Sequence, residues 1–156
     1  MKASLKKGFG FGLTSGVITT LGLIIGLYSG TNSLKVVLGG IFVIAISDSM
    51  SDALGIHISE ESQLKTTTKA IWEATISTFF SKFIIAIHFI IPFFIFSLKN
   101  AIIFSIFWGL SLIGVLSFYL AKQQKTKPYK VILEHVFIAV LVIIFTHYIG
   151  QFVASF

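Results

Sequence analysis

The sequence contains no cysteine and no arginine. Without cysteine the chain forms neither structural disulfides nor thiolate metal sites, and thiol catalysis is excluded too. Without arginine it lacks the side chain that contacts phosphate and guanine bidentately, and its 12 basic residues are lysines scattered between apolar runs. We therefore expect no nucleic-acid partner, although the formal net charge is +6.

Charged residues of either sign are scarce. Only 12% of the 156 residues are charged, whereas 55% are hydrophobic, and the mean hydropathy is +0.94. A soluble domain of this size does not need so much apolar surface, so the composition is typical of an integral membrane protein.

Five apolar stretches are each long enough to cross about 30 Å of hydrocarbon. They cover residues 8–28, 33–58, 70–98, 100–121 and 131–155. Because lipid does not tolerate unpaired backbone groups, the stretches must be helices, and their short connections make sequential neighbours antiparallel. We expect an all-α fold that forms one transmembrane domain over residues 1–156. The first stretch is too long for a signal peptide and lacks an A-x-A-like cleavage site, so we expect it to be retained.

The lysines predict which way the chain crosses the membrane. Nine of them fall on one side of the alternating helices: Lys2, Lys6, Lys7, Lys65, Lys69, Lys122, Lys125, Lys127 and Lys130. Only Lys35 and Lys99 fall on the other side. By the positive-inside rule the N-terminus is cytoplasmic and the C-terminus outside. Lys82 lies deeper in the third stretch, and we expect its side chain to snorkel to the cytoplasmic surface.

The first stretch is rich in small residues. Gly12 and Gly16 form a small-xxx-small pair, and Ser15, Thr19, Gly22 and Gly26 recur at helical spacing on one face. This face permits close helix approach, and it could also line a substrate path. The two interpretations are compatible.

The second stretch carries two carboxylates, Asp48 and Asp52, which project from the same helical face because they are four residues apart. They lie about 22 and 28 Å from the start of the helix near Ser33, and we expect Ser51 beside them and Ser15 on the neighbouring helix. Charges inside a membrane segment are costly and mark an ion path, a proton relay or a buried partner. Alternatively, this end of the helix is exposed to water, and the two carboxylates are simply solvated.

Two carboxylates this close disfavour each other's ionisation, so a divalent cation would displace a proton that they hold. This coupling is what a metal/proton exchanger requires. Further groups gather towards the same end and could form an entrance, although each could equally be an ordinary interfacial residue. They are His57, Glu60, Glu61, Glu73, Glu134 and His135. For His88 and His147 we expect hydrogen-bonded positions in the core.

We expect no enzyme, because neither G-x-S-x-G nor H-E-x-x-H spacing occurs. The first two helices instead resemble the vacuolar iron transporter family. The similar strings are Gly12-Leu13-Thr14-Ser15-Gly16 and Ser47-Asp48-Ser49-Met50-Ser51-Asp52-Ala53-Leu54-Gly55-Ile56-His57-Ile58-Ser59. Ile91-Pro92-Phe93 and Thr146-His147-Tyr148-Ile149-Gly150 are similar to the family's third and last helices.

The resemblance implies a homodimer that transports Fe2+ or Mn2+ along a path formed by the first and second helices. It also implies the cell membrane of a prokaryote, or the vacuolar membrane of a eukaryote. Ser15 stands where the family has aspartate, and Asp52 where it has methionine, which leaves a harder set of donors. The connection over residues 59–69 holds only Glu60 and Glu61, so the chain resembles a short form without the cytoplasmic metal-binding domain.

Together these observations predict a divalent metal transporter that moves Fe2+ or Mn2+ out of the cytoplasm by proton exchange. Its expected metal site comprises Asp48, Asp52, Ser51 and Ser15, with an entrance formed by Glu60, Glu61, Glu73, Glu134 and His135. The alternative is a membrane assembly or interaction subunit that has lost metal coordination, and Ser15 is the residue that favours it.

Overall fold

The computed structural model describes residues 3–156, and every regular element in that range is a helix. The elements are α1 (Ala3–Thr31), α2 (Leu34–Glu61), α3 (Thr68–His88), α4 (Ile91–Ile95), α5 (Leu98–Gln123) and α6 (Pro128–Val153). Five spans are long and apolar enough to cross a membrane: α1, α2, α5, α6 and the combined segment Thr68–Ile95. The expected all-α membrane fold with five spanning helices is therefore confirmed.

The third span is not the continuous helix over residues 70–98 that the sequence predicts. It ends at His88, and a turn at Phe89 and Ile90 separates it from α4. Pro92 lies in the first turn of α4, where its missing N–H costs no hydrogen bond, whereas inside a continuous helix it would remove one. The following connection is at residues 96–97, so Lys99 and Asn100 belong to the first turn of α5.

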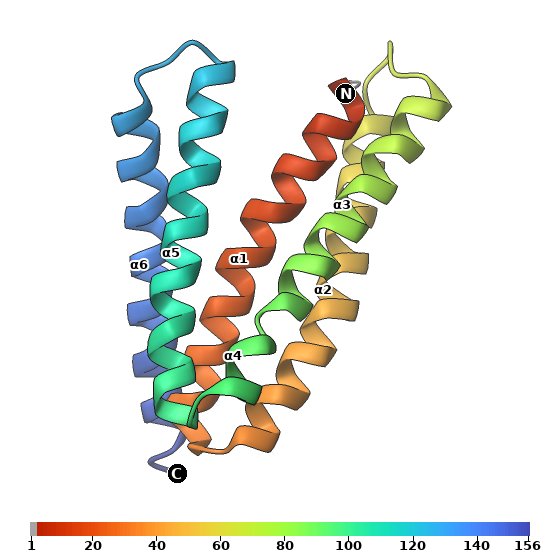
Figure 1. Ribbon diagram of the computed structural model, residues 1–156. Coiled ribbons are helices and arrows are strands. Elements are labelled where there is room, and N and C mark those ends of the chain that lie inside the picture. The colour runs from red at the N-terminus through yellow and green to blue at the C-terminus, as the bar shows by residue number, and fades with distance from the viewer. Residues whose placement is uncertain (1–2) are drawn as a thin grey trace.

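The helices form two groups around α1 (Figure 1). On one side α1 packs with α2 and α3, and on the other it packs against the α5–α6 hairpin. The two groups lie together at the end that holds α4 and the α1–α2 connection. They diverge towards the end that holds the α2–α3 and α5–α6 loops, which we call the lysine-rich end.

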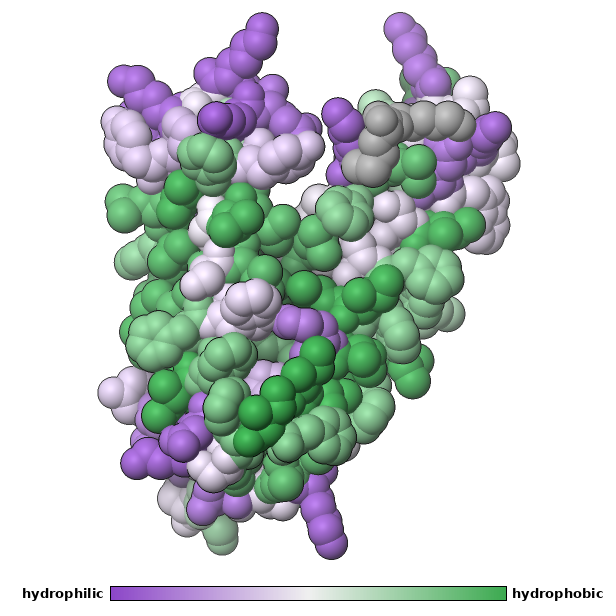
Figure 2. All heavy atoms as spheres, in the orientation of Figure 1, coloured by the Kyte–Doolittle hydropathy of each residue, from purple (hydrophilic) through white to green (hydrophobic). Residues whose placement is uncertain are grey.

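Figure 2 shows a broad hydrophobic band with hydrophilic residues at both ends and more of them at the lysine-rich end. This distribution is what a membrane-spanning protein presents to lipid and water. The placement of the lysine-rich end in the cytoplasm stays a prediction from the lysine pattern.

Glycines set the distance between α1 and α3. Gly8, Gly12 and Gly16 are buried at four-residue intervals on α1 and face α3. A Cβ at Gly12 would lie 2.7 Å from the carbonyl oxygen of Thr78, and one at Gly16 would lie 3.2 Å from Cγ of Lys82. Gly22, nearer the other end of α1, faces Val142 of α6 instead. The close helix approach predicted for the first stretch is thus observed, with two different neighbours.

A Gly12→Ala variant tests this packing against a matched control two residues away. We expect Gly12→Ala to lower the free energy of unfolding by about 1–3 kcal/mol, because the new methyl group would overlap the α3 backbone. Gly10→Ala should not lower stability and should raise it slightly, since a Cβ there meets no atom within 4 Å and alanine is a better helix former than glycine. Thermal unfolding in detergent measures both. Equal melting temperatures for the two variants would contradict the packing.

The absence of cysteine makes orientation directly testable with single-cysteine variants. Leu64 is fully exposed in the α2–α3 loop, and Ser155 is exposed at the opposite end of the molecule. If the lysine-rich end is cytoplasmic, a membrane-impermeant maleimide added to intact cells labels Ser155→Cys and reaches Leu64→Cys only after permeabilisation. The reverse labelling pattern would place the N-terminus outside.

Candidate functional site

Lys82 does not snorkel to the surface as the sequence predicts, and that expectation is wrong. It is 1% exposed and is the largest fully buried side chain among the described residues. Lys82 lies about 21 Å along α3 from Thr68 at the rise of an α-helix, which is far beyond the reach of one side chain. The ammonium instead finds two carboxylates close by, and an ion pair within the protein replaces contact with water.

Four side chains from three helices form one cluster, which we call the Lys82 cluster: Ser15, Asp48, Asp52 and Lys82. Nζ of Lys82 lies 2.6 Å from Oδ2 of Asp48 and forms a second ion pair with Oδ2 of Asp52. The ammonium also donates to Oγ of Ser15 at 2.9 Å. Ser15 in turn donates to Oδ2 of Asp52 at 2.7 Å. The prediction that the helix of Ser15 lies beside the aspartates is confirmed, with the direct contact made to Asp52.

Helix geometry explains how the cluster assembles. Asp48 and Asp52 are one helical turn apart on α2 and so reach the same point. Ser15 is adjacent to Gly16, where α1 lies against the stem of Lys82. A larger side chain at residue 16 would push α3 away, so the glycine pattern of α1 is a condition for the ion pairs.

The cluster lies near the middle of the membrane span. Asp48 is about 20 Å from either end of the 28-residue helix α2, measured along the helix axis. Two carboxylates and one ammonium leave a formal charge of −1, if all three are ionised. Side-chain exposure is 27% for Asp48 and 21% for Asp52, but only 2% for Lys82. The cation is therefore enclosed, while each carboxylate keeps part of its surface open.

Ser51 does not belong to the cluster. It is exposed on α2, whereas Ser49 is buried with a hydroxyl that has no hydrogen-bond partner among the described residues. The sequence interpretation placed Ser51 by its nearness in the chain, but its direction around the helix takes it out of the interface with α1 and α3.

The expected entrance residues do not gather into one mouth. Glu60 is buried and pairs with Lys7, and Glu73 accepts a hydrogen bond from Ser4 at 2.7 Å. Glu61 and Glu134 are exposed. Within residues 3–156 no group of three or more histidine, aspartate or glutamate side chains could hold a metal ion. Glu134 and His135 belong to the α5–α6 hairpin, which diverges from α2 and α3 at this end.

The histidines contact neighbouring helices. His135 and Ser117 share a hydrogen bond of 2.9 Å, and His57 and Thr75 one of 3.0 Å. His147 is hydrogen-bonded to Ser29 at 2.6 Å, as expected for a core histidine. For His88 the expectation is not met at Nδ1, which is buried without a hydrogen-bond partner among the described residues.

An apolar core lies between the cluster and the opposite end of the molecule, which holds α4 and the α1–α2 connection and which we call the lysine-poor end. It includes residues from α1, α2, the α3–α4 turn and the start of α5: Leu21, Ile24, Val37, Ile41, Phe89, Ile90, Phe93, Ala101 and Ile102. These side chains have relative exposures of 0–6%. These packed apolar side chains separate the cluster from that end, although Thr20 Oγ1, Ser105 Oγ and His88 Nδ1 are buried there without a hydrogen-bond partner among the described residues.

Lys82 is the member of the site that sequence reasoning missed. Its position in the sequence was the available signal. Lys82 is the only lysine in the interior of an apolar stretch, and Asp48 and Asp52 are intramembrane carboxylates that could pair with it. Comparison of the chain with known protein families, with curated proteins and with solved structures finds no match.

Removing charges in a defined order tests the cluster. Lys82→Met leaves two carboxylates without a cation, and breaking a buried pair in this way costs about 3–5 kcal/mol. We expect Lys82→Met to lower the melting temperature, and the triple variant that adds Asp48→Asn and Asp52→Asn to recover most of the loss. The control Lys35→Met removes an exposed lysine and should change little. If the added substitutions lower stability further, the ion pairs are not those described.

Proposed function

We propose that the chain is a divalent metal transporter that moves Fe2+ or Mn2+ out of the cytoplasm in exchange for protons. The observation that carries the proposal is the Lys82 cluster, in which two carboxylates surround a cationic group in the middle of the membrane span. Intramembrane charges are costly and are retained for ion paths and relays. A site that already holds an ammonium has the charge and the oxygen donors to hold another cation.

The donor set suits a hard or borderline metal ion. Carboxylate oxygens from Asp48 and Asp52 and the hydroxyl of Ser15 are oxygen ligands of the kind that Mn2+ accepts. The entering metal would take the place of the Lys82 ammonium. The flexible four-carbon stem of lysine would let the amino group turn away from the carboxylates while the helix backbones stay in place. It would leave as the neutral amine, and its proton would be one that the metal displaces.

Access to the carboxylates supports a path on the flank of α2. Asp48 and Asp52 are partly exposed, and the apolar core closes the route towards the lysine-poor end. A cation that enters from the lysine-rich end could reach the cluster without crossing that core. Release on the other side would require the core around Phe89 to separate, and the break between α3 and α4 is the place where the third span can bend.

A homodimer would complete this flank, as the resemblance implies. Ser47, Ser51 and Gly55 are exposed on α2 at four-residue intervals, and a Cβ at Gly55 would meet no atom within 4 Å. Small residues at this spacing allow two membrane helices to approach closely. A second copy packed there would cover the exposed parts of the two aspartates and exclude lipid from them.

A second candidate is a membrane assembly subunit without transport activity. The observation that favours it is Lys82 itself, because its ammonium already occupies the space between the carboxylates. In that case the cluster would serve only to hold α1, α2 and α3 in register.

Manganese flux into proteoliposomes tests the proposal. We expect saturable Mn2+ transport that an opposing pH gradient accelerates, and we expect the Asp48→Asn, Asp52→Asn double variant to fall to the rate of empty liposomes. Lys35→Gln, at the exposed lysine-poor end, should transport as the unmodified chain does. Undiminished flux in the double variant would exclude the aspartates as the exchange site.

Calorimetric titration of the purified protein with Mn2+ separates the two candidates. The transporter should show saturable binding, and Lys82→Gln should bind about tenfold more tightly because the competing ammonium is gone, a change equivalent to about 1.4 kcal/mol. The assembly subunit would show no saturable binding in either form.

A further inference from the structure

A cleft of about 380 Å³ lies between the first half of α1 and the α5–α6 hairpin, on the side of α1 away from α3. It forms where the two helix groups diverge towards the lysine-rich end, and Figure 2 shows the molecule divided into two lobes at this end. The metal site proposed above uses none of the side chains that line it.

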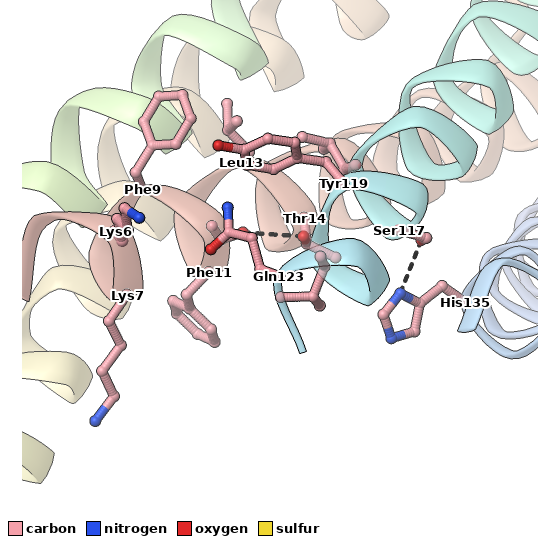
Figure 3. Close-up of a pocket in the computed structure, with 13 residues that line it drawn as sticks. Lys6, Lys7, Phe9, Phe11, Leu13, Thr14, Ser117, Tyr119, Gln123 and His135 are labelled. Atoms are coloured by element: carbon pink, nitrogen blue, oxygen red, sulfur yellow. Dashed lines mark hydrogen bonds between the residues drawn. The ribbon is translucent and has the colours of Figure 1, made fainter. Parts of the chain in front are cut away.

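The cleft is amphipathic. Phe9, Leu13 and Tyr119 belong to its largely apolar wall, and Figure 3 shows them with the polar residues around the same space. Lys6 is the fourth residue of α1, and Gln123 is the last residue of α5, so both are close to the end of the membrane span. Further in, the lining is largely apolar, and its polar members are Thr14 and the hydrogen-bonded pair Ser117 and His135. A polar rim above a largely apolar wall matches a molecule with a polar head and a hydrocarbon tail.

The charge at the rim is positive. Lys6 is exposed and has no ion-pair partner within residues 3–156, whereas the adjacent Lys7 is paired with Glu60. The end of α5, the α5–α6 loop and the first turn of α6 add four more lysines near this end, outside the lining itself: Lys122, Lys125, Lys127 and Lys130. Glu134 is the only acidic residue of the hairpin. An anionic head group is therefore favoured over a zwitterionic one.

We propose that this cleft binds an anionic phospholipid, with its phosphate head group at Lys6 and an acyl chain between α1 and α5. The apolar wall at membrane depth favours a lipid over a free anion, since a free phosphate would leave the aromatic surface exposed. Gly10 supports this position of the acyl chain. A Cβ built at Gly10 meets no atom within 4 Å, so the space beside the α1 backbone is open to the lipid. The bound lipid fills the gap that the diverging hairpin leaves beside α1.

Native mass spectrometry of the detergent-purified chain, mixed with equimolar phosphatidylglycerol and phosphatidylcholine, tests the proposal. We expect the unmodified chain to retain phosphatidylglycerol preferentially and to keep it when inorganic phosphate is added. Lys6→Gln should lower the ratio of bound phosphatidylglycerol to phosphatidylcholine about fivefold, the effect of one lysine beside an anionic lipid surface.

Gly10→Leu should abolish retention of both lipids, since its side chain would occupy the cleft. The matched control is Gly114→Leu on α5, where a Cβ also meets no atom within 4 Å and which is not among the residues that line the cleft. It should retain phosphatidylglycerol as the unmodified chain does. Equal binding of the two lipids, displacement by inorganic phosphate, or full retention in Gly10→Leu would each overturn the proposal.

Discussion

The structure depends on one constraint: the ammonium of Lys82 is buried in the middle of a membrane span and must be matched there by negative charge. Neither lipid nor the apolar core can solvate it, so α2 has to present Asp48 and Asp52 at the same depth. This requirement sets the depth of α2 relative to α3. It also makes Ser15 on α1 useful, because its hydroxyl both accepts from Lys82 and donates to Asp52.

Small residues make that match possible. Gly8, Gly12 and Gly16 bring α3 against α1, and without their close contact Lys82 would lie further from Ser15. The glycines nearer the other end of α1 bring it against α6, so one helix organises both groups. Because α1 contacts its neighbours on different faces along its length, the groups diverge at the lysine-rich end. The proposed metal path and the proposed lipid cleft thus lie on different sides of α1.

In the proposed function, metal binding and structural pairing would compete for the same atoms. Each carboxylate is already paired with the ammonium, and an entering metal would have to break those ion pairs. The partial exposure of Asp48 and Asp52 favours exchange, since a purely structural ion pair would be better enclosed. The burial of Lys82 favours a fixed partner. Our proposal unites the two observations by making Lys82 the group that the metal displaces.

The sequence by itself determined the features that depend on local pattern. Apolar runs longer than a bilayer is thick specify five spanning helices, and four-residue spacing specifies that Asp48 and Asp52 share a face. Only the tertiary structure decided that Lys82 joins them, because the residues are 30 or more positions apart and their meeting depends on how α3 is rotated against α1 and α2. The tertiary structure also decided that Glu134 and His135 lie apart from Glu60 and Glu73. Periodicity reports which residues share one helix face, but it carries no information on which helix that face meets.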